Sequence, residues 1–151
     1  MSTTEKSYQN TQVLELLGDI YKSEMAGISR YLHYSFMIMG YNRIPIQAWF
    51  RDNAKEAMDH ATAVGEKITS LGGHPPVVAA KVEEGNLHTV QQLLEESLRF
   101  EEEAIVKYKQ LVHLATDLGD IALEEMARDF VRQEVEHADE VRKMMRRPEA
   151  G

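Results

Sequence analysis

Four stretches of the chain repeat apolar residues at alternating spacings of four and three, the pattern of a helix that buries one stripe against partner helices. We predict helices over residues 7–40, 45–72, 89–118 and 120–146. Their ends carry matching signals. Pro45 suits a first turn, Thr89 and Gln92 have the form of a capping box, and Asp120 suits an N-cap directly after Gly119. The connections are short, long and short, so we predict an all-α, up-down four-helix bundle with one long crossover between the second and third helices.

The buried stripes carry ionisable residues where apolar ones are expected. The fourth stripe runs Leu123, Ala127, Phe130, Glu134, His137, Val141, Met144. The other three stripes contribute Glu24, His60 and Glu101. Each lies near the middle of its helix, so an antiparallel bundle would bring them to one level. One such residue is more often a hydrogen-bonded core residue or a buried salt bridge, but four coincident stripes favour a shared site.

Carboxylates packed together without a cation would repel each other and be forced to take up protons. Divalent metal removes that conflict, and mixed imidazole and carboxylate ligation suits iron or manganese. A known dinuclear pattern places one Glu on each of two helices and a Glu-x-x-His motif on each of the other two. The sequence therefore predicts a two-metal site at Glu24, His60, Glu101, Glu134 and His137.

The second helix departs from this pattern, because the residue three positions before His60 is Ala57 rather than Glu. Glu56 lies one residue earlier, on nearly the same face of the helix. We therefore include Glu56 as a candidate ligand that supplies the missing carboxylate. The alternative is that Glu56 is a surface residue and the second metal binds weakly.

Composition narrows the classes of function. The 151 residues suffice for a single domain with a substantial core, so we expect one domain over residues 1–151. A formal charge of −8 argues against nucleic acid as a partner. The chain has no cysteine, which excludes disulfides and thiolate sites. No apolar run approaches the length of a membrane span, and no signal peptide precedes the first helix, so we expect a cytoplasmic protein.

At these residues the chain resembles the bacterioferritins of the ferritin-like superfamily. The strongest stretches are SEMAGISRYLHYSFM (residues 23–37), MDHA (58–61) and RQEVEH (132–137). The resemblance implies that Glu24, His60, Glu101, Glu134 and His137 bind two iron ions and oxidise Fe(II) with O2 or peroxide. It also implies that Tyr31 lies close to the metals. Ala57 replaces the bridging Glu of that family.

The same resemblance bears on haem and on assembly. Met58 matches the methionine that ligates haem between two bacterioferritin subunits, although a packing methionine is the commoner role. The chain ends at RRPEAG, where Pro148 opposes a fifth helix like that of the ferritin cages. We therefore expect a homo-oligomer and leave a 24-subunit cage, a 12-subunit shell and a dimer open.

Three functions follow, in this order of preference. The first is oxidation of Fe(II) at the dinuclear site for iron storage or detoxification. The second is a non-storage dimetal peroxidase or oxidase of the rubrerythrin or manganese-catalase kind. The third is a helical interaction module with a degenerate metal site, for which Ala57 is the main support.

Overall fold

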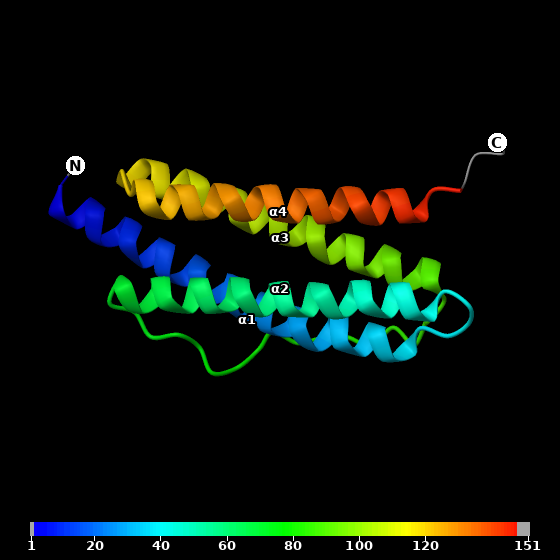
Figure 1. The fold of residues 1–151 in the computed structure, drawn as a ribbon. Helices are drawn as coiled ribbons and strands as arrows, with labels where there is room; N and C mark the ends of the chain where they lie inside the picture. The colour runs from blue at the N-terminus through cyan, green and yellow to red at the C-terminus, as the bar shows by residue number, and fades with distance from the viewer. Residues whose placement is uncertain (1, 148–151) are drawn as a thin grey trace.

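The computed structural model describes residues 2–147 and contains four α-helices over that range, with no strand (Figure 1). The helices are α1 (Thr3–Met37), α2 (Arg43–Ser70), α3 (Val90–Leu118) and α4 (Ile121–Met145). The prediction of an all-α four-helix protein is confirmed. The expected absence of a fifth helix concerns residues 148–151, which lie outside the described residues. Among residues 2–147, no helix is both long enough and apolar enough to cross a bilayer.

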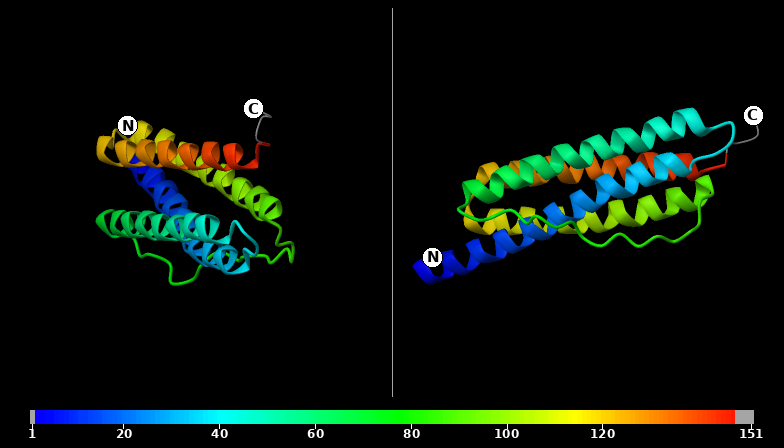
Figure 2. Two further views of the ribbon diagram at one scale, coloured as in Figure 1. Left: turned by 45° about the vertical axis from the view of Figure 1, so that its right-hand side comes forward. Right: turned by 90° about the horizontal axis from the view of Figure 1, so that it is seen from below.

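The helices form two hairpins that pack against each other. In Figure 1, α1 and α2 form one antiparallel pair and α3 and α4 the other. Residues 71–89 connect the hairpins and run along the length of the bundle beside α1, as both views in Figure 2 show. A hydrogen bond from the Ala80 amide to the Lys22 carbonyl, at 3.0 Å, ties this crossover to α1. As a result, α2 and α3 run in the same direction.

Local hydrogen bonds explain where the helices begin. The side chain of Ser2 accepts from the amide of Glu5, and the side chain of Glu5 accepts from the amide of Ser2. This capping box starts α1 at Thr3, four residues earlier than the sequence pattern predicted. The predicted capping box of Thr89 and Gln92 is confirmed. The predicted Asp120 N-cap is also confirmed, because Oδ1 of Asp120 accepts from the Leu123 amide at 3.0 Å.

Two glycines in the left-handed region lie in the turns that join the helices of each hairpin. Gly119 adopts φ 69°, which only glycine does readily, and it ends α3 as predicted. Gly40 adopts φ 96° in the turn between α1 and α2. Helix α1 ends at Met37, three residues before the predicted boundary, because Ile38 adopts extended backbone. Helix α2 begins at Arg43, two residues before Pro45.

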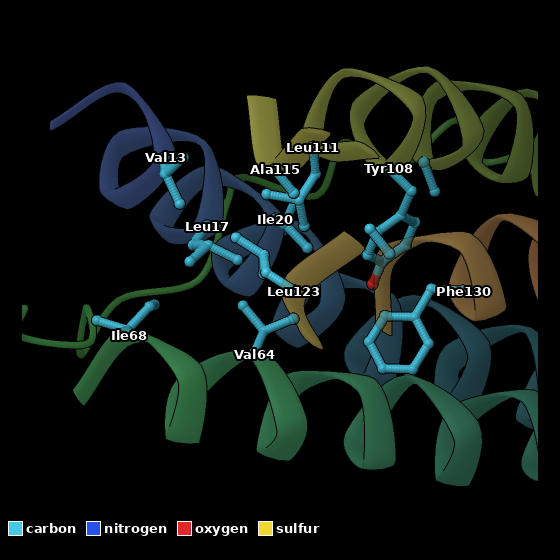
Figure 3. Packing of buried hydrophobic residues seen from close by; sticks show 12 residues of the cluster. Val13, Leu17, Ile20, Val64, Ile68, Tyr108, Leu111, Ala115, Leu123 and Phe130 are labelled. Atoms are coloured by element: carbon cyan, nitrogen blue, oxygen red, sulfur yellow. The ribbon is translucent and has the colours of Figure 1, made fainter. Parts of the chain in front are cut away.

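Apolar side chains form two clusters, one in each half of the bundle. The first contains Leu17, Val64, Leu111 and Leu123, one from each helix, all fully buried (Figure 3). The second is built around Tyr31, Phe50, Leu94 and Val141. The predicted ionisable residues lie along the helices between these clusters, so apolar packing closes both ends of the region they occupy.

Candidate metal centre

Each helix places one buried ionisable side chain at the level between the two apolar clusters. Glu24, His60, Glu101 and Glu134 are only 2–5% exposed. His137 follows Glu134 by one turn of α4, and its side chain is 18% exposed. The structure therefore brings together all five residues that the stripes singled out.

One group of ligand atoms joins α1, α2 and α4. Nδ1 of His60 lies 3.1 Å from Oε1 of Glu134 and 3.7 Å from Oε1 of Glu24. The three ligand atoms lie within 4.8 Å of one another, which is close enough for one cation to contact all three.

A second group joins α3 and α4. Nδ1 of His137 lies 3.9 Å from Oε2 of Glu101 and 3.9 Å from Oε2 of Glu134. The ligand atoms of this group also lie within 4.8 Å of one another. Glu134 belongs to both groups, with one carboxylate oxygen directed to each. This arrangement is the one required of a carboxylate that bridges two metal ions.

Neighbouring side chains fix the orientation of the candidate ligands. The hydroxyl of Tyr108 donates to Oε1 of Glu24 at 2.7 Å, and the hydroxyl of Tyr31 donates to Oε1 of Glu101. Figure 3 shows Tyr108 reaching into the bundle beside Phe130. The resemblance implied that Tyr31 lies near the metals, and in the structure its hydroxyl contacts Glu101, one of the candidate ligands. The role of Tyr108 was not predicted, although its position on the α3 stripe, seven residues after Glu101, contained the signal.

Glu56 lies on the outer side of the two histidines. Its Oε2 is 2.6 Å from Nε2 of His137, and its Oε1 is 3.8 Å from Nε2 of His60. Both Nδ1 atoms face the other way, toward the buried carboxylates. Gln133, which sequence reasoning missed, places its Oε1 2.8 Å from Nε2 of His60. Glu56 therefore reaches both histidines, but on the Nε2 side of each ring. The Nδ1 atom of each ring faces the cluster instead.

Ala57 leaves space beside the ligands. Its methyl group is buried and borders a small cavity that Glu24, Glu56, Glu101 and Glu134 also line. Asn53, one turn earlier on α2, is buried at the same cavity. Glu56 is therefore the one carboxylate of α2 at this cavity, and the two ligand groups share the carboxylate of Glu134.

Burial governs the protonation of the cluster. It raises the pKa of Glu24. It also raises the pKa of Glu101 well above its usual range, and the nearby Glu134 raises the pKa of Glu101 further. Burial alone would lower the pKa of His60, but Glu134 and Glu24 outweigh it and raise this pKa to about 11. Burial alone would raise the pKa of Glu134, but hydrogen bonds with Glu101 and His60 outweigh it and lower this pKa. In the absence of a cation, the raised pKa values of Glu101 and His60 favour the protonated form of both groups.

The donor set fits divalent metal. Nδ1 of His60 and Oε2 of Glu101 are shielded from solvent and make no hydrogen bond of acceptable geometry with any described residue. Both atoms belong to the cluster, and an unpaired buried polar atom of this kind costs about 1–3 kcal/mol. Once deprotonated, imidazole nitrogens and carboxylate oxygens are the ligands that iron and manganese accept.

Comparison with known families agrees with this geometry. A family model described as a ferritin-like domain matches residues 14–150. The chain belongs to the ferritin-like domain family. No curated protein sequence matches this family member at a significant level.

Solved structures show the same fold at low sequence identity. A ferritin-like diiron-carboxylate protein from Bacillus anthracis str. Ames superposes with a TM-score of 0.88 at 24% identity, covering 97% of this chain and all of that one. Dps from Thermosynechococcus elongatus gives a TM-score of 0.89 at 20% identity, covering 96% and 97%. The Rhodobacter capsulatus bacterioferritin, described with a metal-free dinuclear site and a haem iron, gives 0.82 at 23% identity, covering 89% and 84%. At these identities the likeness establishes the ferritin-like fold.

Met58 lies apart from the metal centre. Its side chain is on the surface of α2 and is 60% exposed. Packing at a helix interface, the alternative to haem ligation, would therefore need a second copy of the chain. Haem ligation between two copies stays a prediction.

Metal binding should release protons, because a cation must displace those held by the cluster. We expect Mn(II) to release on the order of one or two protons per chain at pH 7, since the pKa values of Glu101 and His60 are raised. Calorimetry in buffers of different ionisation enthalpy measures this number. Glu101→Gln should reduce it, and binding without proton release would contradict this account of the metal-free cluster.

Proposed function

We propose that this ferritin-like protein binds two Fe(II) ions in the buried cluster and oxidises them with O2 or peroxide, for iron storage or detoxification. The observation that supports this proposal best is the position of Glu134, whose two oxygens face two separate ligand groups. Two ions held by one carboxylate lie close enough to give electrons to the same oxidant molecule. Fe(II) is the substrate in this proposal, and manganese is the alternative metal.

The ligands divide into two sets. Glu24 and His60 hold one ion, Glu101 and His137 hold the other, and Glu134 contacts both. The two ions release two electrons in becoming Fe(III). With two protons, these electrons reduce O2 to hydrogen peroxide or, with peroxide as the oxidant, reduce it to two water molecules. Tyr108 and Tyr31 hold Glu24 and Glu101 in place by donating to one oxygen of each.

Charge balance gives Glu56 a part in this scheme. Three buried carboxylates leave two divalent ions about one negative charge short, and Glu56 is the nearest further carboxylate on α2. Because it contacts the outer nitrogen of His137, we assign it as a positioning residue that orients the imidazole and raises its basicity. Carboxylates paired in this way with a metal-bound histidine are a common feature of metal sites.

The proposal extends to assembly. Large apolar side chains around the α1–α2 turn are exposed, including Phe36 (54%), Met39 (69%), Tyr41 (fully) and Ile44 (72%). An exposed group of this kind on a small domain favours association with a second copy. We therefore propose a homo-oligomer. We also propose that the chain forms a single domain and is cytoplasmic. Haem at Met58 would then lie between two subunits, and nucleic acid and membranes would not be partners.

Aerobic addition of Fe(II) to metal-free protein tests the storage function directly. We expect rapid oxidation followed by retention of tens of iron ions per chain in solution. Glu134→Gln should abolish the rapid phase, because both ligand groups lose their shared carboxylate. Glu136→Gln is the matched control, since this exposed residue lies on the same helix and pairs with Arg132.

The alternatives predict other results in the same titration. Saturation at two ions or fewer, with turnover of peroxide, would replace storage by a non-storage dimetal peroxidase or oxidase. Absence of any bound iron would overturn both functions and leave an interaction module with a degenerate site.

Replacing Glu56 distinguishes a positioning residue from a ligand. We expect Glu56→Ala to keep two bound Mn(II) ions per chain but to weaken one of them by about 10–100-fold, because His137 loses its orienting partner. Isothermal calorimetry measures both quantities, and Glu66→Ala, at an exposed site on α2, is the control. Loss of a whole ion in Glu56→Ala would instead make Glu56 a ligand, as the sequence pattern suggested.

A further inference from the structure

A second group of potential metal ligands lies outside the central cluster. It consists of His33 on α1, Glu84 in the crossover and His88 just before α3, whose ligand atoms all lie within 4.8 Å of one another. His33 follows Glu24 by nine residues, about 13 Å along the axis of α1, so the two groups do not share a site. The proposed function uses none of these three residues.

Glu84 is the centre of this group, and the local backbone holds it in place. Its Oε1 accepts from the Asn86 amide at 2.7 Å and lies 3.1 Å from Nε2 of His88. Asn86 adopts a left-handed conformation with φ 55°, which turns the chain back between Glu84 and His88. The turn brings the carboxylate and one imidazole to the same point on the surface of α1.

His33 supplies the second imidazole from that surface. Its Nε2 faces Oε2 of Glu84, and the two imidazole rings lie 5.8 Å apart between centroids. Although the His33 side chain is 42% exposed, its Nε2 atom is shielded from solvent and makes no hydrogen bond of acceptable geometry to any residue of 2–147. A ring nitrogen and a carboxylate oxygen that face each other at close range need a proton or a cation between them.

We propose that His33, Glu84 and His88 form a third cation site, specific for a borderline transition metal such as Zn(II). Two imidazoles and one carboxylate are a recurrent set of three protein ligands for zinc, with solvent in the fourth position. The three ligands come from α1, the crossover and the start of α3. A bound cation therefore fastens residues 84–88 of the crossover to α1.

This role follows from the scarcity of backbone hydrogen bonds between the crossover and α1. Residues 71–89 contain no helix or strand, and the one backbone hydrogen bond found between this segment and α1 is that from Ala80 to Lys22. A cation that binds only the folded arrangement stabilises it in proportion to the logarithm of its concentration over its dissociation constant. The site is independent of iron oxidation in the central cluster.

Native mass spectrometry of the metal-free full-length protein with Zn(II) tests the proposal. We expect the double variant His33→Ala/His88→Ala to bind one Zn(II) ion fewer per chain than the unmodified protein. His113→Ala removes an exposed histidine of α3 that is in neither ligand group and should bind the unmodified number. An equal number of ions in the double variant and the unmodified protein would overturn the site.

Two further measurements separate this site from the central one. Glu134→Gln should lose ions at the centre but keep Zn(II) protection of residues 80–88 from hydrogen exchange, whereas Glu84→Gln should lose that protection. Glu84→Gln also serves where the double variant does not fold, because the change is isosteric. Unchanged protection in Glu84→Gln contradicts the proposal whether or not the central cluster binds iron.

Discussion

The buried negative charge of Glu24, Glu101 and Glu134 is the constraint on which the rest of the structure depends. Three carboxylates in the middle of a bundle are tolerated only with compensating positive charge, because desolvation and mutual repulsion both oppose their ionisation. Without metal, raised pKa values at Glu101 and His60 provide that compensation as protons. In the proposed function, two Fe(II) ions would replace these protons. The same buried carboxylates that need compensation in the metal-free bundle would then supply the ligands for iron.

The apolar core makes this possible by fixing the four helices on both sides of the cluster. Leu17, Val64, Leu111 and Leu123 pack at one end, and Phe50, Leu94 and Val141 pack at the other. Each helix is thereby held in the register that directs its ionisable residue inward. Tyr108 and Tyr31 fix the orientation of two carboxylates of the site. Each ring packs in an apolar cluster, and each hydroxyl donates a hydrogen bond to a carboxylate.

The sequence predicted the fold and the five central residues because both depend on helical periodicity. An apolar stripe interrupted by Glu134 and His137 identifies a buried charge before any coordinates are known. Periodicity could not show which nitrogen of His137 faces Glu56, because that depends on side-chain rotation. Nor could it find the group around Glu84, whose members lie in a crossover without a repeating pattern and meet only through the turn at Asn86. The start of α1 was missed because the capping box of Ser2 and Glu5 precedes the apolar stripe.

Anomalous diffraction from crystals grown with Mn(II) tests the central claim most directly, because Mn(II) takes the same ligands as Fe(II) without being oxidised during the experiment. The account predicts two anomalous peaks between the four helices, one beside His60 and one beside His137, with an oxygen of Glu134 bound to each. A single peak, or two peaks that Glu134 does not bridge, would contradict it.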